Sequence, residues 1–392
     1  MTGADGWNAD AIGLWAQNAR QPAIQATLAA INAASTPKPV PLVLQLAYYL
    51  FLTGDPAAAA RFLAMGLHDH PDHPEILRNL AACLSRSGQA DQAIFAARRY
   101  VAIRPDDASA WDTLAANLHR TGDTNGAVAA GTRALSLKDQ VGLPPAGWSL
   151  PAADTTGLDA RPGLRNVLTF ALWGADPRYL RGVLDNALAA PEVYPGWQMR
   201  VHADASVPAE LLSALTGLGV RVIAEPAGQP MSQRLAWRFR AANDPGVNRF
   251  LVRDADSVIS RREAAAVADW MDSGRWFHVM RDWWTHTDVM LAGMWGGVAG
   301  VLPPVMPLVA GYRPPHLETP NVDQWFLRDR VWPMVRQSCL VHDRCFVPSG
   351  ATVWPAPSPT GSDHVGQCEF TARGPAQAAR LARWIDRLSC LR

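Results

Sequence analysis

The chain has 392 residues, of which 48% are hydrophobic and 18% are charged, and its formal net charge is +1. This length is enough for two or three domains, and the hydrophobic share is ordinary for a globular protein. The near-zero net charge gives no reason to expect bulk attraction to nucleic acid or to anionic lipid.

The basic residues are almost all arginine, because lysine occurs only at Lys38 and Lys138. Beyond residue 138 this excludes lysine-dependent chemistry such as a P-loop or a Schiff base, whereas arginine remains available to bind phosphate. The five cysteines show no C-x-x-C spacing, which favours reduced thiols and a cytoplasmic location. The chain shows neither a secretory signal pattern nor a run of 18 apolar residues, so we expect no transmembrane helix.

Residues 40–140 contain a repeat with a period of 34 residues. Three columns share this spacing: Gly54, Gly88 and Gly122; Ala47, Ala81 and Ala115; Leu50, Leu84 and Leu118. Several columns with one period resemble the tetratricopeptide repeat, a pair of helices joined by a tight turn. The pattern predicts the helices Val43–Thr53, Pro56–His68, Pro74–Ser87, Ala90–Ile103, Ala108–Thr121 and Thr124–Leu137.

The repeats are expected to form a solenoid whose groove binds a protein partner or an acceptor, with a spacer or dimerisation role as the alternative. Residues 1–39 are expected to form a helical cap, over Ala11–Asn32. Residues 141–164 are rich in Pro, Gly, Asp and Thr without a period, which predicts an interdomain linker.

From residue 165 to residue 392 predicted strands alternate with predicted helices, which indicates a parallel, Rossmann-like sheet. The predicted strands are Asn166–Leu172, Trp197–Ala203, Val220–Ala224, Phe250–Val252 and Trp276–Met280. Between them we expect helices over residues 176–190, 208–218, 232–242 and 260–274. Prolines between residues 303 and 320 predict a long loop, followed by the helix Val322–Val335. The amphipathic tail Ala376–Leu391 is expected to pack across the domain.

The predicted strand Phe250–Val252 ends in two carboxylates, Asp254 and Asp256. Two anions at the carboxyl end of a buried strand are costly unless a cation neutralises them, and this edge of an open α/β sheet is where ligands bind. Carboxylate oxygens suit Mg²⁺ or Mn²⁺. The sequence therefore predicts a divalent cation that holds a phosphate-containing ligand.

These motifs carry a family resemblance over about residues 165–370. Asp254-Ala255-Asp256 resembles the metal-binding Asp-x-Asp motif of GT-A glycosyltransferases, and residues 321–324 are similar to the Asp-Gln element of several GT-A families. The segments 277–282 and 291–296 resemble segments of a set of bacterial proteins in which tetratricopeptide repeats precede such a domain. The resemblance implies transfer of a sugar from a nucleotide-sugar donor, with Mn²⁺ or Mg²⁺, to a glycan, a lipid-linked intermediate or a protein.

For the metal, the resemblance implies that Asp256 is a direct ligand and that Asp254 contacts the metal, its bound water or the donor ribose. A third ligand is expected from a histidine near the end of the domain, either His342, which we favour, or His364.

For catalysis, the resemblance implies a carboxylate close to the donor sugar. The candidates are Asp282, which follows a predicted strand, and Asp323, which by analogy holds sugar hydroxyls beside Gln324. Trp295 is expected to bind the sugar ring, and Arg253 to reach the phosphates ahead of Arg234 and Arg238. A helix cap, a core contact or a salt bridge is the ordinary alternative for each of these residues.

Three rival functions fit part of the pattern. A phosphatase of the haloacid dehalogenase type also has Asp-x-Asp at a strand end, but it usually begins with the motif and adds a downstream lysine. A nicotinamide-binding domain needs G-x-G-x-x-G after its first strand, which residues 173–177 lack. The third rival is a non-catalytic repeat adaptor with a degenerate nucleotide-sugar-binding domain. The expected location is cytoplasmic, with a peripheral position at the inner membrane as the alternative.

Overall fold

The computed structural model describes residues 5–140, 142–152, 155, 158, 163–314, 321–346, 348, 350–359, 361–368 and 375–392. The chain divides into two compact units, Met1–Asp139 and Gln140–Arg392. Within the described residues, no helix is both long enough and apolar enough to span a membrane.

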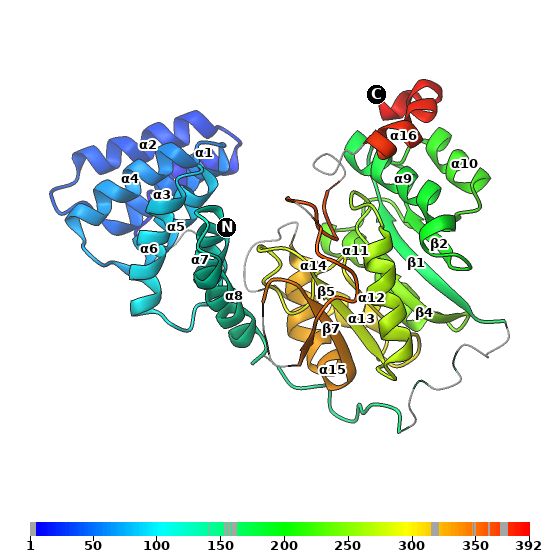
Figure 1. The fold of residues 1–392 in the computed structure, drawn as a ribbon. Coiled ribbons are helices and arrows are strands. Elements are labelled where there is room, and N and C mark those ends of the chain that lie inside the picture. Colours follow the sequence, from blue (N-terminus) through cyan, green and yellow to red (C-terminus); the bar gives the residue numbers. More distant parts are fainter. Residues whose placement is uncertain are drawn as a thin grey trace. The chain divides into compact units, whose positions relative to one another are not determined.

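The first unit is built from helices that pack in chain order, as Figure 1 shows in blue to dark green. They are α1 (Ala9–Ala16), α2 (Arg20–Ala33), α3 (Val40–Leu52), α4 (Pro56–Asp69), α5 (Pro74–Arg86), α6 (Ala90–Ile103), α7 (Ala108–Arg120) and α8 (Thr124–Lys138). From α3 onward each boundary lies within three residues of its prediction. The packing of α3 on α5 and of α5 on α7 gives the stacked pairs expected of a tetratricopeptide solenoid.

The turn inside each pair depends on its repeated glycine. Gly54, Gly88 and Gly122 have φ angles of 88°, 79° and 86°, in the left-handed region that side chains with a Cβ rarely adopt. In the first pair, the side chain of Asp55 then accepts a hydrogen bond from the Ala58 amide and caps α4. The 34-residue period therefore reflects the turn in each repeat at which one helix ends and the next begins.

The expected helical cap over Ala11–Asn32 consists of two helices, α1 and α2. Asn18 has a φ of 64°, so the chain turns between α1 and α2 at a residue type that tolerates this conformation. Trp15 of α1 stacks on Tyr49 of α3 with ring centroids 4.1 Å apart. The cap thus covers the apolar end of the solenoid.

The second unit contains a sheet with the strand order β3-β2-β1-β4-β6-β5-β7-β8. The strands are β1 (Arg165–Leu172), β2 (Gln198–Ala203), β3 (Arg221–Ala224), β4 (Val247–Val252), β5 (Phe277–Arg281), β6 (Trp295–Val298), β7 (Cys339–Asp343) and β8 (Ala351–Thr352). The expectation of a parallel sheet is correct for β1 to β4, but β6 runs antiparallel between β4 and β5. The sheet is therefore mixed, and β6, β7 and β8 were not predicted.

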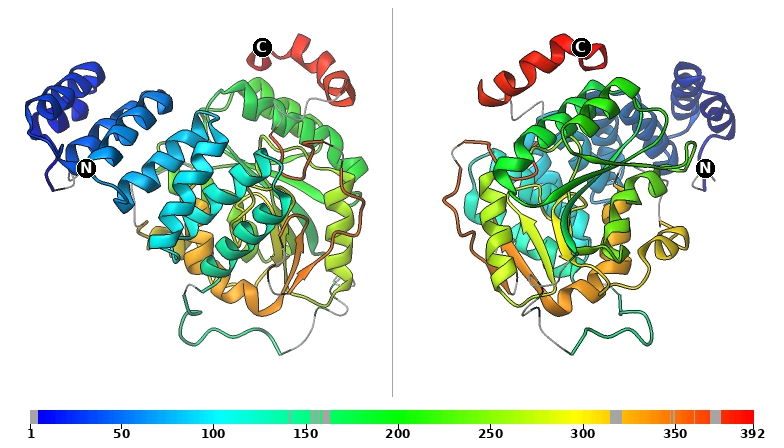
Figure 2. Two further views of the ribbon diagram at one scale, coloured as in Figure 1. Left: turned by 60° about the vertical axis from the view of Figure 1, so that its left-hand side comes forward. Right: turned by 90° about the vertical axis from the view of Figure 1, so that its right-hand side faces the viewer.

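Helices cover both faces of this sheet (Figures 1 and 2). One face packs on α9 (Pro177–Val193), α10 (Ala209–Gly217) and α12 (Arg261–Asp272), through alternate strand residues such as Leu168, Phe170 and Leu251, and α16 (Pro375–Arg387) packs on α9. The other face packs on α11 (Met231–Ala236) and the 3-10 helix η2 (Trp237–Asn243), on which α13 (Val305–Ala310) and α14 (Val322–Phe326) pack in turn. Burial on both faces explains the near-continuous apolar character of β1 and β4.

Two predictions beyond β6 need correction. The proline-rich stretch expected to be a long loop contains α13. The expected helix Val322–Val335 is α14, a π-helical turn η3 (Leu327–Val331) and α15 (Trp332–Val335). Pro333 lacks an N–H to donate to the Asp329 carbonyl, and the wider π turn lies directly before it.

Both ends of the second unit pack onto its core. In the segment expected to be a linker, the indole of Trp148 donates a hydrogen bond to the Val301 carbonyl at 3.0 Å, and Thr155 and Leu158 are buried. At the other end, Leu381 of α16 and Leu391 of η5 (Ser389–Leu391) join the core beside α9. Arg380 adds an ion pair of 2.8 Å to the buried Asp185.

Candidate functional site

A cavity of about 760 Å³ lies at the carboxyl ends of β1 and β4. From β1 the chain runs outward to β2 and β3, and it then returns to β4 on the opposite side of β1. The loops after β1 and β4 consequently lead in opposite directions along the sheet, which is the arrangement that opens a ligand crevice in α/β proteins. The walls include residues 171–176 at and beyond the end of β1, residues 254–257 after β4, and Arg178, Tyr179, Met231, Leu235, Arg238, Ala292, Asn321, Asp323, Gln324, Gly366 and Cys368.

Three carboxylates and two guanidinium groups meet in this cavity. Arg238 of η2 forms ion pairs with Asp254 and, through Nη2 at 2.8 Å, with Asp323. Arg178 of α9 donates from Nε to Oδ2 of Asp256 at 2.7 Å. With the carboxylate of Asp176, which also lines the cavity, four carboxylates and two guanidinium groups give a net charge of −2 when all six are ionised, so the cavity can accept a further cation.

Burial changes the proton affinity of two of these acids. Burial, with a smaller contribution from the charge of Asp254, raises the pKa of Asp323 to about 6 against the opposing effect of Arg238. Burial also raises the pKa of Asp256, with a smaller contribution from Asp254. Asp323 can therefore exchange a proton near neutral pH.

The loop that carries Asp254 and Asp256 is held by close backbone approaches. A Cβ on Gly182 of α9 would lie 2.3 Å from the Ala255 carbonyl oxygen, and a Cβ on Gly293 would lie 2.1 Å from Oδ2 of Asp254. Asn186 of α9 donates to the Ser257 carbonyl at 2.8 Å and accepts from the Ile259 amide at 2.9 Å. The close approaches at Gly182 and Gly293 and the two hydrogen bonds of Asn186 thus hold both carboxylates in position.

Asp254, Asp256, Asp323 and Gln324 are the predicted site residues that the structure brings together. Arg238, which was ranked behind Arg253, joins them as the bridge between Asp254 and Asp323. The amide of Gln324 donates to Oδ1 of Asp323 at 2.9 Å, so the Asp-Gln element orients its own carboxylate.

Arg253 and Trp295 do not line this cavity. Side chains alternate along a strand, so Arg253 leaves β4 on the opposite side from Asp254 and forms a buried ion pair of 2.9 Å with Glu263. Trp295 is fully buried, with its ring against Phe239 and Phe250. Both side chains are part of the core.

Asp282 is also separate from the cavity. It is fully buried and accepts hydrogen bonds from Arg262 at 2.9 Å and from the Val365 amide at 2.8 Å. Arg344 pairs with it at 3.1 Å. Asp282 thus links the segment around Val365 to the end of β5. This is the buried ion pair that we gave above as the alternative to a catalytic role.

His342 does not lie with Asp254 and Asp256. Its Nε2 contacts Asp269 at 2.9 Å, and its Nδ1 contacts Nε2 of the buried His278 at 2.9 Å. The alternative, His364, donates through Nδ1 to the Ser362 carbonyl at 2.7 Å and stacks on Trp283. Within the described ranges, no group of three or more His, Cys, Asp or Glu side chains is placed to share a metal ion.

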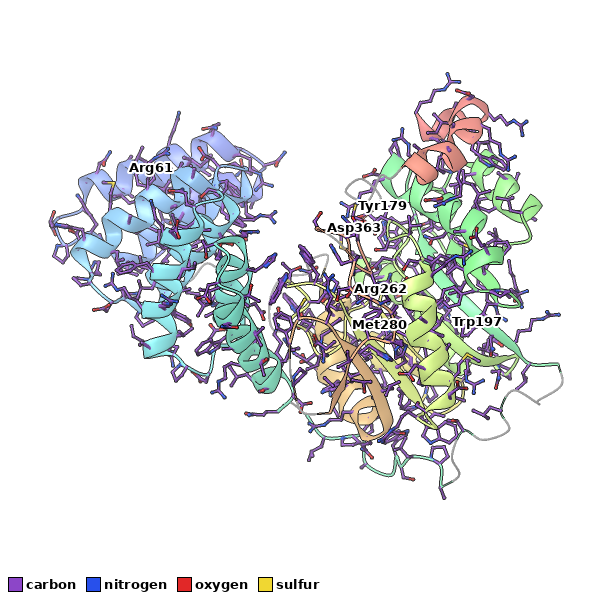
Figure 3. The ribbon with its side chains drawn as sticks, in the orientation of Figure 1. Arg61, Tyr179, Trp197, Arg262, Met280 and Asp363 are labelled. Carbon is purple, nitrogen blue, oxygen red and sulfur yellow. The ribbon has the colours of Figure 1, made fainter. Side chains whose placement is uncertain are left out.

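Sequence reasoning missed Arg178 and Tyr179, two cavity residues in the first turn of α9. Figure 3 labels Tyr179 on the same side of the second unit as Asp363 of the C-terminal segment. One signal was present, because a cation in the first turn of a helix is disfavoured by the helix dipole and needs an anionic partner. That partner, Asp256, is 78 residues away in the chain.

The oxygens of Asp254 and Asp256 could bind a hard divalent cation if water and substrate phosphates complete its coordination. Arginine contacts take Oδ1 of Asp254 and Oδ2 of Asp256, so a metal would use Oδ1 of Asp256 and Oδ2 of Asp254, which also packs against Gly293. Mg²⁺ in particular is often held by one or two carboxylates together with water and substrate phosphates. Asp254 and Asp256 satisfy that pattern without a histidine.

Comparison with known proteins supports the repeat region. The tetratricopeptide repeat family model matches residues 50–118. A search of curated proteins gave no match.

Among solved structures, MamA is 21% identical with a TM-score of 0.31, covering 33% of this chain and 74% of MamA. The O-GlcNAc transferase of Thermobaculum terrenum is 14% identical with a TM-score of 0.37, covering 62% of this chain and 44% of that one. The peptide-binding tetratricopeptide protein YrrB is 15% identical with a TM-score of 0.30, covering 33% of this chain and 66% of YrrB. These similarities are too low to assign a function to this chain.

Proposed function

We propose that the second unit is a metal-dependent glycosyltransferase of the GT-A type, which uses a nucleotide-sugar donor. The observation that carries the proposal is the meeting of Asp254, Asp256 and Asp323 in one cavity at the carboxyl ends of β1 and β4. The Asp-x-Asp and Asp-Gln elements that resemble GT-A motifs are more than 60 residues apart in the chain, yet both line this cavity. Two sequence elements that act in one reaction must lie in one site, and these two elements do.

Asp254 and Asp256 would hold Mn²⁺ or Mg²⁺ through the carboxylate oxygens that arginine leaves free. When bound, the cation supplies positive charge that stabilises a departing nucleoside diphosphate. Arg178 lines the same cavity with 42% of its side chain exposed, so its guanidinium can contact a phosphate as well as Asp256.

Asp323 is the proposed acceptor of the proton. Its pKa of about 6 leaves it largely ionised at neutral pH but still basic enough to take a proton from an acceptor hydroxyl. Arg238 orients it from one side and the Gln324 amide from the other. This assigns the chemistry to Asp323, and Asp282 keeps a structural role.

The first unit is proposed to bind a protein partner or the acceptor itself. A groove of about 530 Å³ runs over α4, α5 and α6, and the ring of Phe95 beside it is 65% exposed. Exposed aromatic side chains at a groove favour a protein contact. The variant Phe95→Glu is expected to lower transfer to the acceptor while leaving donor hydrolysis unchanged; equal transfer by both proteins would contradict this role.

A second candidate function follows from the same arginine contacts. Because Arg178 and Arg238 already neutralise much of the acidic cluster, the cavity can exist without a metal, as in a non-catalytic adaptor with a degenerate nucleotide-sugar-binding domain.

The test is release of nucleoside diphosphate from a panel of UDP- and GDP-sugars, with and without Mn²⁺. The transferase predicts slow, metal-dependent hydrolysis of one donor class, abolished in Asp256→Asn and retained in the control Asp272→Asn, at an exposed position on α12. Absence of any metal-dependent release, with both variants folded, favours the adaptor.

A further inference from the structure

Asp323 lines a second cavity besides the one that holds Asp254 and Asp256. This second cavity has a volume of about 260 Å³ and lies among α11, η2, α13 and α14. Its apolar walls are formed by Ala236, Phe239, Val309, Tyr312, Val322 and Phe326. We call it the aryl pocket, for the reasons that follow.

The walls of the aryl pocket are fixed by contacts among its aromatic residues. Phe239 stacks on Phe326 with centroids 6.3 Å apart, and Tyr312 meets Phe326 edge to face at 5.7 Å. The Tyr312 hydroxyl donates to Asp329 at 2.7 Å. Because the phenol already has this partner, Tyr312 contributes mainly its ring to the pocket.

Three polar side chains line this pocket, those of Ser232, Arg313 and Asp323. Arg313 at its margin donates from Nη1 to the carbonyls of Ala310 and Tyr312, at 3.0 and 3.1 Å. Asp323 is the acidic residue of the lining. A hexose placed here would bury several hydroxyls without partners, and each such loss costs about 1–3 kcal/mol.

The volume of the aryl pocket also limits the size of its ligand. Whole small-molecule sites usually have volumes of roughly 300–1,000 Å³, so a pocket of about 260 Å³ suits one ring or a short branched group. Aromatic rings pack favourably edge to face or offset, which the three aromatic walls allow.

We infer that the aryl pocket binds an aromatic group that carries the acceptor hydroxyl, such as a phenol or a benzyl-type alcohol. The inference rests on the proposed function and narrows its acceptor. The acceptor oxygen would form the bond to the anomeric carbon of the donor sugar while the bond from that carbon to the diphosphate oxygen breaks. The bonding electrons leave with the diphosphate, and the hydroxyl proton passes to Asp323.

The test uses fluorine NMR on the full chain with two probes, 4-fluorobenzyl alcohol and 6-deoxy-6-fluoroglucose. The variant Ser232→Trp places a large ring at a half-buried position that lines the pocket. The control Gln233→Trp makes the same change at the next residue, which is also half-buried but is not part of the lining.

We expect line broadening of the aryl probe with the wild type and with Gln233→Trp, its loss with Ser232→Trp, and no broadening of the sugar probe in any sample. Equal broadening with Ser232→Trp, no broadening with the wild type, or stronger broadening of the sugar would each overturn the inference. Nucleotide binding is measured on the same samples by calorimetry. Aryl binding without nucleotide binding would reject the proposed transferase while leaving the pocket's preference intact.

Discussion

The guanidinium of Arg178, in the first turn of α9, lies 2.7 Å from the carboxylate of Asp256 at the end of β4. This pair places a positive charge beside a carboxylate that a divalent cation would use. In the proposed site, cation binding would therefore be coupled to the Arg178–Asp256 contact, and a diphosphate bound with the cation would give Arg178 a new partner.

Substitution of this arginine separates the two effects. In Arg178→Met we expect Mn²⁺ alone to bind about two- to fivefold more tightly, because a half-exposed competing ion pair is worth at most about 1 kcal/mol. We expect a nucleoside diphosphate to bind more weakly with Mn²⁺ present, since a phosphate contact is lost. Calorimetry with each ligand measures both changes, and two unchanged affinities would show that Arg178 has neither role.

Arg238 is predicted to be essential for the stability of the second unit. Arg238→Met leaves the buried Asp323 without its ion-pair partner, a change that typically costs about 3–5 kcal/mol. In the double variant Arg238→Met/Asp323→Asn no buried charge is left unpaired, so part of the loss should be recovered. Urea unfolding of both single variants and the double variant completes the cycle; a double variant as unstable as the sum of the singles would contradict the coupling.

The activity is expected to depend on the ionisation of Asp323. A base must be deprotonated, so kcat/KM should fall about tenfold per pH unit below the pKa of Asp323, which is about 6, and level off above it. Asp323→Asn should have low activity without this pH dependence. Nucleotide binding at pH 5 is the control, and an Asp323→Asn enzyme with the wild-type profile would exclude this role.

The stability of the second unit is expected to fall in acid because of His278. Burial lowers the pKa of His278 well below its usual range, so below about pH 6.5 the unfolded state binds a proton that the folded state does not. His278→Gln should lower the pH dependence of the unfolding free energy by up to about 1.4 kcal/mol per pH unit. Urea unfolding at pH 7 and pH 5.5 tests this, with the exposed His68→Gln as the control.

Two glycine substitutions test how the carboxylate loop is held. Gly182→Ala should destabilise the second unit by about 1–3 kcal/mol and weaken metal-dependent nucleotide binding, because its Cβ would collide with the Ala255 carbonyl. Gly217→Ala, in α10 with no atom within 4 Å of its new Cβ, should be neutral or slightly stabilising. Thermal unfolding compares the two, and similar melting temperatures would show that α9 adapts to the added methyl group.

Local patterns predicted the solenoid well because each repeat is specified by residues close together in the chain. The turn glycines and caps fixed the ends of α3 to α8 within a few residues. In the second unit the same signals located β1 to β5, but β6 is a short strand with two glycines, and its antiparallel position depends on pairing with β4 and β5. Sequence periodicity carries no information about such pairing.

In the candidate site too, residues placed by local sequence were predicted, and residues placed by partners far along the chain were not. Asp254 and Asp256 were visible because a strand end places both of them, and Asp323 because of its neighbour Gln324. His342 was misplaced because its partner Asp269 comes from α12, 73 residues earlier. Arg253 was expected at the phosphates, yet strand alternation directs it to Glu263 on the other face of the sheet.

The most direct test of this account is a calorimetric titration of the full chain with UDP, GDP and CMP, with and without Mn²⁺. The account predicts that one nucleotide binds only when Mn²⁺ is present, and that Asp256→Asn abolishes this binding while Asp272→Asn retains it. Binding that is equal with and without Mn²⁺, or absent for all three nucleotides with the folded protein, would contradict a metal-dependent nucleotide-sugar site.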